Sequence, residues 1–338
     1  MAPNSNDRLI EILRAFAGKR ILVVGDVMLD RFVLGRVDRL NPEAPVPILL
    51  AESEQAAAGG AGNTAKNAAV LGATVTLIGV TGAGPVASDL KAAVGREGFR
   101  SILIEDAARR TTEKRRYLIR SQQMLRVDSE ETRPIGGQVE GQVVEAIERE
   151  AAEVDAILVS DYAKGVVTEK VAAAVMGAMK KHGLLVMADV KPLNIEFFHG
   201  VTAISPNLQE AHEYLGLNRM QARSPWPELA SGLHQRFGTD VYLTLSENGV
   251  FVWSRQTPGR HVPQAHRIEV ADTSGCGDTA AVVLLMARLC GATDEEAAEL
   301  ANAAGAIVAS KIGATAPPRQ ELIELLGRTE DSSRGVEP

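Results

Sequence analysis

Short apolar segments alternate along this chain with longer stretches of helical period, and this alternation restricts the fold more than any other feature. The apolar segments lie at residues 21–30, 74–80, 155–161, 184–190, 201–207 and 241–247. Strands that alternate with helices are joined by right-handed crossovers, which produce a parallel sheet covered on both faces. The sequence therefore predicts an α/β fold with a central, mostly parallel sheet, whose first strand ends at Asp26.

Two segments interrupt this alternation. Residues 31–53 favour β structure and contain three prolines, and residues 111–128 alternate with a period of two, which is the period of a half-buried strand. Neither segment suits a crossover helix, so we expect both to form a small β-sheet lid within a single domain of residues 1–338. Residues 327–338 are polar and are expected to form a flexible tail.

Composition excludes several classes of protein. The 338 residues include 36 Lys and Arg against 43 Asp and Glu, a net charge of −7, so the positive charge that non-specific nucleic-acid binding requires is lacking. Two cysteines form no disulfide framework, which is typical of the reducing cytoplasm. No apolar run approaches the roughly 20 residues of a membrane-spanning helix. We therefore expect a cytoplasmic protein that binds neither nucleic acid nor membrane.

Polar residues stand where several of the predicted strands end. They are Asp26, Asp161, Asp189, Asn207 and Ser246. In open α/β sheets, ligands bind beyond the carboxyl ends of the strands. The chemistry of this protein is therefore expected along that edge.

The strongest local signal is a glycine-rich turn, residues 275–278, that leads directly into a long apolar helix. Backbone N–H groups of Gly275, Cys276 and Gly277 can point into one concavity, and the helix N-terminus adds partial positive charge, which together favour an anion. Asp278 would be stabilised there as a carboxylate, ready to accept a proton. The alternative is a simple helix cap, which would not need this many small residues.

Two further motifs indicate ligand contacts. Gly59 and Gly60 precede a helical stretch and allow close approach of the backbone to a ligand, while Asn63 can donate to and accept from a hydroxyl group; a flexible loop is the alternative. Asn207 and Glu210 are spaced to hold a hydrated Mg²⁺, but the same spacing is typical of a helix capping box. The sequence alone does not separate these two interpretations.

Other patterns carry little weight. Residues 82–87 match a relaxed dinucleotide-binding fingerprint, but Pro85 interrupts it and the unit does not follow the first strand. The phosphate-binding P-loop motif is absent, and the six histidines show no paired ligand spacing. Residues 109–126 form a local basic cluster, most of which is expected to be a solvated strand face, with one or two members available to clamp a phosphate.

Taken together and in this order, the motifs resemble those of the ribokinase-like (PfkB) family of sugar kinases. The resemblance spans nearly the whole chain, and its most specific element is the sequence DTSGCGD at residues 272–278. Residues 21–30, 59–63 and 207–210 resemble the first-strand acid, the glycine signature and the N-x-x-E motif of the family. It implies the ribokinase-like α/β fold, ATP as phosphoryl donor, Mg²⁺ and a sugar acceptor.

Within that family, the chain is similar to the heptose 7-phosphate kinases of lipopolysaccharide-core precursor synthesis. The similarity is carried by residues 40–49, 58–69, 120–128 and 160–165. It implies transfer of the γ-phosphoryl group of ATP to the anomeric hydroxyl of D-glycero-D-manno-heptose 7-phosphate. Many relatives carry an adenylyltransferase after the kinase; because the chain ends about 60 residues after Asp278, we expect the kinase alone.

The resemblance also implies roles for individual residues. Asp278 would be the general base, beside the anion-binding amides of Gly275, Cys276 and Gly277. Sugar contacts are assigned to Asp26, Asp30, Gly59, Gly60, Asn63, Asp161 and Lys164, and contacts with the 7-phosphate to Arg120, Arg126 and Lys191. Nucleotide contacts are assigned to Asn207, Glu210, Thr244, Ser246, Gly249 and Asn302. Mg²⁺ is placed at Asn207 and Glu210, and a monovalent cation such as K⁺ at Asp272 and Ser274.

Three expectations complete the hypothesis. The lid is expected to mediate a homodimer, since pairing two small sheets would cover their edges. Cys276 replaces a small residue usual in the family, and the helix N-terminus is expected to lower the pKa of its thiol and make it sensitive to oxidation. Three alternatives remain: a kinase of ribose, fructose or a nucleoside, a non-catalytic sugar-binding relative, and an oxidoreductase.

Overall fold

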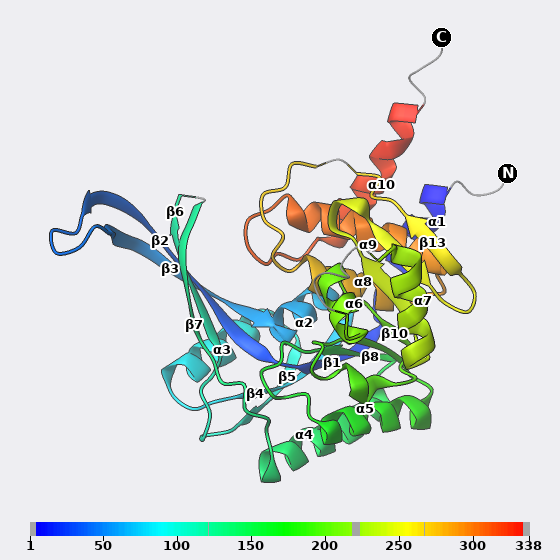
Figure 1. Cartoon of the computed structure of the whole chain (residues 1–338), viewed down its shortest axis with the longest axis horizontal. Coiled ribbons are helices and arrows are strands. Elements are labelled where there is room, and N and C mark those ends of the chain that lie inside the picture. Colours follow the sequence, from blue (N-terminus) through cyan, green and yellow to red (C-terminus); the bar gives the residue numbers. More distant parts are fainter. Residues whose placement is uncertain (1–4, 121, 218–223, 267, 334–338) are drawn as a thin grey trace.

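The computed structural model describes residues 5–120, 122–217, 224–266 and 268–333. It consists of an α/β body and a long β-sheet lid that projects from one side of it (Figure 1). The strands of the main sheet lie in the order β13-β12-β11-β10-β9-β8-β1-β4-β5. Their bounds are β1 Arg20–Gly25, β4 Thr74–Thr81, β5 Arg100–Glu105, β8 Ala156–Ser160, β9 Leu185–Asp189, β10 Ala203–Ile204, β11 Asp240–Thr244, β12 Val250–Trp253 and β13 Pro258–Val262.

The main sheet is mostly parallel, as the sequence predicts. Every pairing from β5 to β11 is parallel, and only the β11–β12 and β12–β13 pairings at one edge are antiparallel. Each of the apolar segments predicted as strands overlaps one of the observed parallel strands. The expected end of the first strand is also confirmed, because β1 stops at Gly25 and Asp26 follows it.

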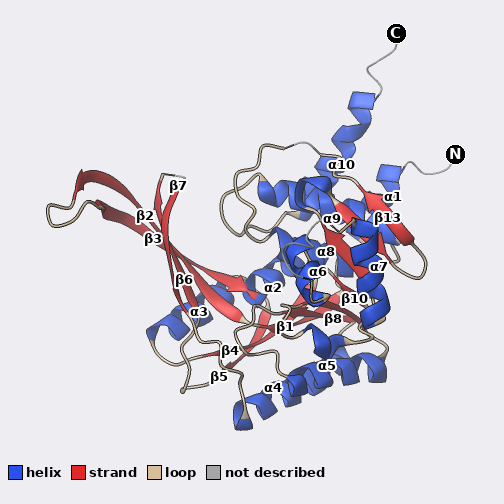
Figure 2. Cartoon of the chain, viewed as in Figure 1, coloured by secondary structure: helices blue, strands red, loops and turns tan. Residues whose placement is uncertain are grey.

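Helices cover both faces of the main sheet (Figure 2). One face carries α1 Ser5–Arg14, α2 Ala61–Val70, α3 Pro85–Arg96, α8 Cys276–Leu289, α9 Asp294–Ala309 and α10 Arg319–Ser333, and the other carries α4 Gly137–Glu150, α5 Glu169–His182, α6 Leu208–Tyr214 and α7 Trp226–Phe237. In β1, Ile21 and Val23 enter the first core whereas Leu22 and Val24 enter the second. This alternation explains why a doubly covered strand reads as a continuous apolar run. None of the helices within the described ranges is long and apolar enough to cross a bilayer.

The lid is a separate four-stranded sheet with the order β3-β2-β6-β7. Its strands are β2 Val27–Leu40, β3 Pro47–Gly60, β6 Glu113–Ile119 and β7 Gln122–Ser129. The small sheet is thus present, and its first two strands extend beyond the predicted 31–53 at both ends. The segment 54–60 was missed because Ala and Gly are weak strand formers; it pairs with β2 as far as Val27↔Gly60.

A buried arginine joins the root of the lid to the body. The guanidinium of Arg31 on β2 donates to Glu113 on β6 at 2.5 Å and to Asp89 on α3 at 2.7 Å, and it also pairs with Glu54 on β3. Arginine suits this position because its planar fork can serve several carboxylates at once. The lid is therefore anchored where its strands leave the body.

The C-terminal segment differs in part from the expectation. α10 continues to Ser333, so the first residues of the expected tail, 327–333, are helical. Residues 334–338 of that segment lie outside the described residues.

Close packing of β1 against β8 predicts a stability effect at Gly25. A Cβ atom at this position would lie 1.8 Å from the carbonyl oxygen of Ser160, and a backbone atom of a central strand cannot yield without disturbing the sheet. We expect Gly25→Ala to lower the free energy of unfolding by about 3 kcal/mol, measured by denaturant titration.

Gly177 in α5 provides the matched control. A Cβ atom there meets nothing within 4 Å, so Gly177→Ala should raise the free energy of unfolding by about 0.5–1 kcal/mol through helix propensity. Equal effects of the two substitutions would contradict the assigned packing.

Candidate active site

A cavity of about 850 Å³ opens at the carboxyl ends of the central strands, between them and the N-terminus of α8. Predicted site residues that line it come from the glycine-rich turn and from the ends of several strands. They are Asp161, Lys191, Asn207, Glu210, Thr244, Ser246, Gly249, Gly275, Cys276, Gly277, Asp278 and Asn302. Residues separated by more than 140 positions in the sequence thus meet in one cavity, at the edge of the sheet where the parallel topology predicts it.

The glycine-rich turn forms the wall of the cavity at the start of α8. Gly275 is the N-cap with φ +80°, a left-handed conformation that favours glycine. The N–H of Cys276 donates a long bond of 3.3 Å to the Thr273 carbonyl, whereas the N–H groups of Gly275 and Gly277 have no partner among the described residues. Unpaired N–H groups at a helix N-terminus that face a cavity form an anion-binding site.

Asp278 lies in the first turn of α8, with only 5% of its surface exposed. Its Oδ1 accepts hydrogen bonds from the Tyr162 hydroxyl at 2.5 Å and the Thr64 hydroxyl at 3.1 Å, and its Oδ2 accepts one from Nδ2 of Asn63 at 2.6 Å. Burial raises the pKa of this carboxyl group, and these three hydrogen bonds counteract the rise. A carboxylate in such surroundings is a suitable proton acceptor.

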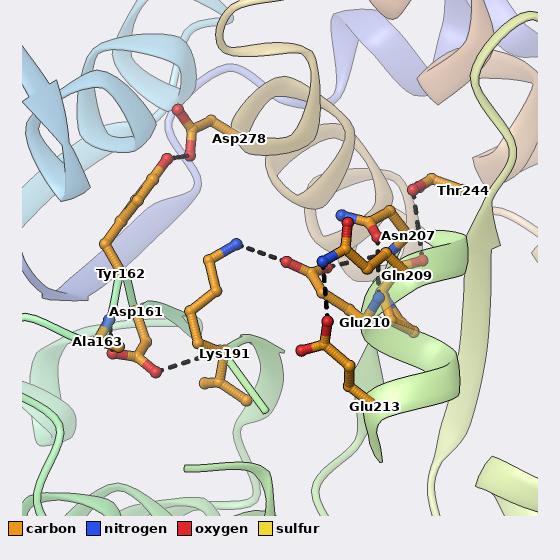
Figure 3. Close-up of polar contacts among 12 residues, drawn as sticks. Asp161, Tyr162, Ala163, Lys191, Asn207, Gln209, Glu210, Glu213, Thr244 and Asp278 are labelled. Carbon is orange, nitrogen blue, oxygen red and sulfur yellow. Dashed lines mark hydrogen bonds and ion pairs between the residues drawn. The ribbon is translucent and has the colours of Figure 1, made fainter. Parts of the chain in front are cut away.

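Asn207 and Glu210 form a complete capping box at the start of α6. The Asn207 side chain accepts from the Glu210 N–H at 3.0 Å, and the Glu210 carboxylate accepts from the Asn207 N–H at 3.1 Å. The second carboxylate oxygen of Glu210 accepts from Nζ of Lys191 at 2.5 Å (Figure 3). The capping interpretation is therefore realised, while both side chains still line the cavity.

Among the described residues that line the cavity, acidic side chains outnumber basic ones. The acids are Asp161, Asp189, Glu210, Glu247 and Asp278, and Lys191 is the one lysine in this set. Burial and the carboxylates of Glu210 and Asp278 raise the pKa of Asp189 to about 8. Such an excess of hard oxygen ligands fits a divalent cation. Within the described ranges, no group of three or more potential ligand side chains is arranged to hold a metal ion by itself.

Part of the lining of the cavity is apolar. It includes Ile268, Val270, Ala301 and Ala306, and the same cavity is lined by Thr244, Ser246 and Gly249. Asn302 is 7% exposed, and its Nδ2 donates to the carbonyl of Val262 at 3.0 Å. A flat apolar slot with a few polar groups is typical of a site for a nucleobase.

Asp26 was predicted to contact the sugar, and in the structure its carboxylate accepts hydrogen bonds from backbone N–H groups. Its Oδ2 accepts from the N–H groups of Tyr162 at 2.8 Å and Lys164 at 2.9 Å, and its Oδ1 accepts from that of Val166 at 3.1 Å. Burial and the charge of Asp161 raise its pKa to about 6. In this structure, Asp26 therefore fixes the loop that follows β8.

Asp30, whose charge acts on Asp278, contacts the glycines at the end of β3. Asp30 pairs with Arg116 and is 6% exposed. A Cβ atom on Gly59 would lie 2.2 Å from Oδ2 of Asp30, so glycine is required at this contact. Gly60 is the N-cap of α2, the helix that carries Asn63.

Several predicted contacts lie outside the cavity. Arg120 forms the turn between β6 and β7, Arg126 pairs with Asp128 on the exposed face of β7, and Lys164 pairs with Glu130 at 2.8 Å. Asp272 accepts hydrogen bonds from the N–H groups of Ser274 and Gly313, both at 2.9 Å. Asp272 thus joins the glycine-rich turn to the loop after α9.

Sequence reasoning assigned no role to Tyr162, Thr64 or Asp189, although Asp189 was noted as a strand end. Tyr162 and Asp189 line the cavity, and Thr64 bonds to Asp278. The only sequence signal for Tyr162 is its place directly after a strand end, in residues 160–165. No pattern in α2 distinguishes Thr64 from an ordinary helical residue.

The fold defines the class of protein. Two solved structures share this fold. Ribokinase of Arabidopsis thaliana complexed with ribose and ATP has a TM-score of 0.69 and 19% identity, and the match covers 91% of this chain and 99% of that one. Phosphofructokinase-2 of Escherichia coli in complex with potassium has a TM-score of 0.74 and 15% identity, and the match covers 93% of this chain and 99% of that one. The architecture is the ribokinase-like α/β fold. Residues 19–321 match the pfkB family of carbohydrate kinases, and the chain belongs to this family.

Two curated relatives are more similar in sequence. The bifunctional protein HldE of Caulobacter vibrioides is 42% identical over 319 residues, which cover 94% of this chain and 65% of that protein. D-beta-D-heptose 7-phosphate kinase of Bordetella bronchiseptica is 40% identical over 309 residues, which cover 90% of this chain and 96% of that protein. The chain thus spans about two thirds of the length of the bifunctional relatives that it matches.

The expectation of an acidic Cys276 thiol is wrong. Burial, together with the carboxylates of Asp272 and Asp278, raises its pKa to about 11, and these effects outweigh the helix N-terminus. Because the thiolate is the reactive form, iodoacetamide at pH 7.5 should alkylate Cys276 at least about tenfold more slowly than free cysteine, as followed by peptide mass spectrometry. Alkylation at the rate of free cysteine would contradict this assignment.

Proposed function

We propose that this chain is an ATP-dependent kinase that transfers the γ-phosphoryl group to the anomeric hydroxyl of D-glycero-D-manno-heptose 7-phosphate, giving the 1,7-bisphosphate. The observation that carries the proposal is the buried Asp278 carboxylate beside unpaired amides at the start of α8, facing a cavity. The choice of sugar rests on the 40% identity with the heptose 7-phosphate kinase. Because Cys276 and Cys290 are both free, as is typical of proteins in a reducing compartment, we place the reaction in the cytoplasm.

In the proposed reaction, the oxygen on C1 of the sugar attacks the γ-phosphorus of ATP. A bond forms between these atoms, the bond from the γ-phosphorus to the bridging oxygen breaks, and ADP leaves. Asp278 accepts the hydroxyl proton. The amides of Gly275 and Gly277, with Cys276 between them, stabilise negative charge on the transferring group. Such reactions are accelerated chiefly by positioning and electrostatics.

Asn207 and Glu210 would hold Mg²⁺, and we add Asp189 to this set because its carboxyl group lines the same cavity and is influenced by the charge of Glu210. The ion would neutralise charge on the phosphate oxygens when bound. Lys191, which bonds to Glu210, extends into the same part of the cavity. We therefore assign Lys191 to the phosphates of the donor and no longer to the 7-phosphate.

For the 7-phosphate, we propose Arg116 in place of Arg120 and Arg126. Arg116 pairs with Asp30 and lies over the Phe32 ring at 5.3 Å, at the root of the lid. Its side chain is only 15% exposed, so its charge is little screened by solvent. Sugar hydroxyls would contact Asp161, Lys164 and Asp30 in the space between the lid and the cavity. A monovalent cation is proposed at Asp272 and Ser274.

Asp278→Asn tests the proposed reaction. It should lower kcat by about 10²–10⁴-fold while leaving sugar affinity nearly unchanged, as measured by ADP release with heptose 7-phosphate and by calorimetric binding. A variant with full kcat would overturn the assignment of the base. In the same assay, ribose, fructose and nucleosides should be poor acceptors; preference for one of them would favour a kinase of another sugar.

We also propose that the lid mediates a homodimer. Its edge strand β7 exposes Met124, Leu125 and Val127, with 44–55% of each side chain accessible, and an exposed apolar edge strand is prone to pairing. Sedimentation should show a dimer at micromolar concentration that Leu125→Lys converts to a monomer. A monomeric unmodified chain would refute the lid-mediated dimer.

A further inference from the structure

The donors around Asp278 leave it one direction in which to accept a proton. A carboxylate oxygen has two in-plane lone pairs. Those of Oδ1 are used by Tyr162 and Thr64, whereas Oδ2 receives a single bond, from Asn63. One acceptor position therefore remains, on Oδ2.

The Tyr162 phenol is the shortest of these contacts and the only one from outside α2. It reaches across the cavity wall to α8, as Figure 3 shows. Its backbone is fixed in turn, because the N–H of Tyr162 donates to the buried Asp26 carboxylate at 2.8 Å. Nζ of Lys191 lies 5.6 Å from the centre of its ring. Tyr162 is thus held at both its backbone and its ring.

A tyrosine hydroxyl does not need a carboxylate partner. The buried Tyr214 donates to the backbone carbonyl of Val190, which satisfies its hydroxyl without placing it against a charged group. Tyr162 instead lines the cavity and bonds to the side chain that the proposed reaction requires as a base. Because the Tyr162 hydroxyl bonds to the proposed base and not to a neutral backbone group, we interpret this hydrogen bond as functional.

We propose that Tyr162 is a positioning residue, which orients the Asp278 carboxylate so that its remaining acceptor site faces the sugar hydroxyl and keeps that carboxylate in its charged form. This inference rests on the proposed kinase function. The proposal assigns the tyrosine no contact with the transferred phosphoryl group. Its hydrogen bond remains in place throughout the cycle.

The electrostatic surroundings make this bond important. Burial raises the pKa of Asp278, the charge of Asp30 adds to this rise, and Tyr162 supplies the first of the hydrogen bonds that oppose it. The titratable and charged groups that face the pair are Asp30 on β2, Asp189 on β9, Lys191 after β9, and Cys276 on α8. Loss of the phenol hydroxyl therefore raises the pKa of Asp278, which must then be deprotonated at higher pH.

Tyr162→Phe tests the proposal, since it removes the hydroxyl and keeps the ring. We expect kcat at pH 6.5 to fall about tenfold, the worth of one hydrogen bond to a charged group, with KM for both substrates within about twofold of the unmodified enzyme. The acid limb of the kcat/KM profile should move to higher pH, so that the deficit shrinks as the pH rises toward 9.

Tyr242→Phe is the matched control. The Tyr242 hydroxyl also donates to a buried carboxylate, Asp294, at 2.5 Å, but neither residue lines the cavity. This variant should lose stability without a change in the pH profile. Thermal unfolding of both variants separates folding effects from catalytic ones.

The outcomes are distinguishable. If Tyr162→Phe keeps the kcat and acid limb of the unmodified enzyme while Asp278→Asn is inactive, the inference about Tyr162 is wrong and the kinase proposal stands. An increase in kcat would also overturn it, because the phenol would then obstruct the base. If the unmodified chain phosphorylates none of the sugars, the proposed function itself fails.

Discussion

A buried carboxylate held by three donors from two other parts of the chain is the interaction on which the candidate site depends. Asp278 lies at the start of α8, Asn63 and Thr64 lie in α2, and Tyr162 follows β8. Since burial alone would favour the neutral acid, these contacts are needed if Asp278 is to act as a base. The same contacts join the two helices to the sheet, so stability and the geometry of the site share one set of hydrogen bonds.

Much of the fold could be predicted from the sequence because its physical causes are local. Apolar segments marked the parallel strands except β5 Arg100–Glu105, and their alternation with helical stretches predicted a parallel sheet covered on both faces. The lid was located but its length was underestimated, because residues 54–60 are held in β structure by pairing with β2 and not by their own propensity.

The candidate site was predictable only in part. The glycine-rich turn and the Asn207 and Glu210 pair were found because helix N-termini carry clear sequence signals. The partners of a carboxylate are set by tertiary contacts, so the loop-fixing bonds of Asp26 and the donors to Asp278 were not visible in any spacing. The basic cluster at residues 109–126 likewise gave no indication of which members lie near the cavity. Arg126, for example, pairs with Asp128 on β7 and does not line the cavity.

The points where the lid leaves and rejoins the body have a mechanical consequence. β2 begins at Val27, one residue after the carboxylate that fixes the Tyr162 loop, and β3 ends at Gly60, three residues before the Asn63 amide. The ends of these two lid strands therefore lie next to Asp26, which fixes Tyr162, and close to Asn63, which bonds to Asp278 directly. Any rotation of the lid strands would be transmitted through the covalent backbone to Asp26 and Asn63, and from these to Asp278 only through the hydrogen bonds of Tyr162 and Asn63.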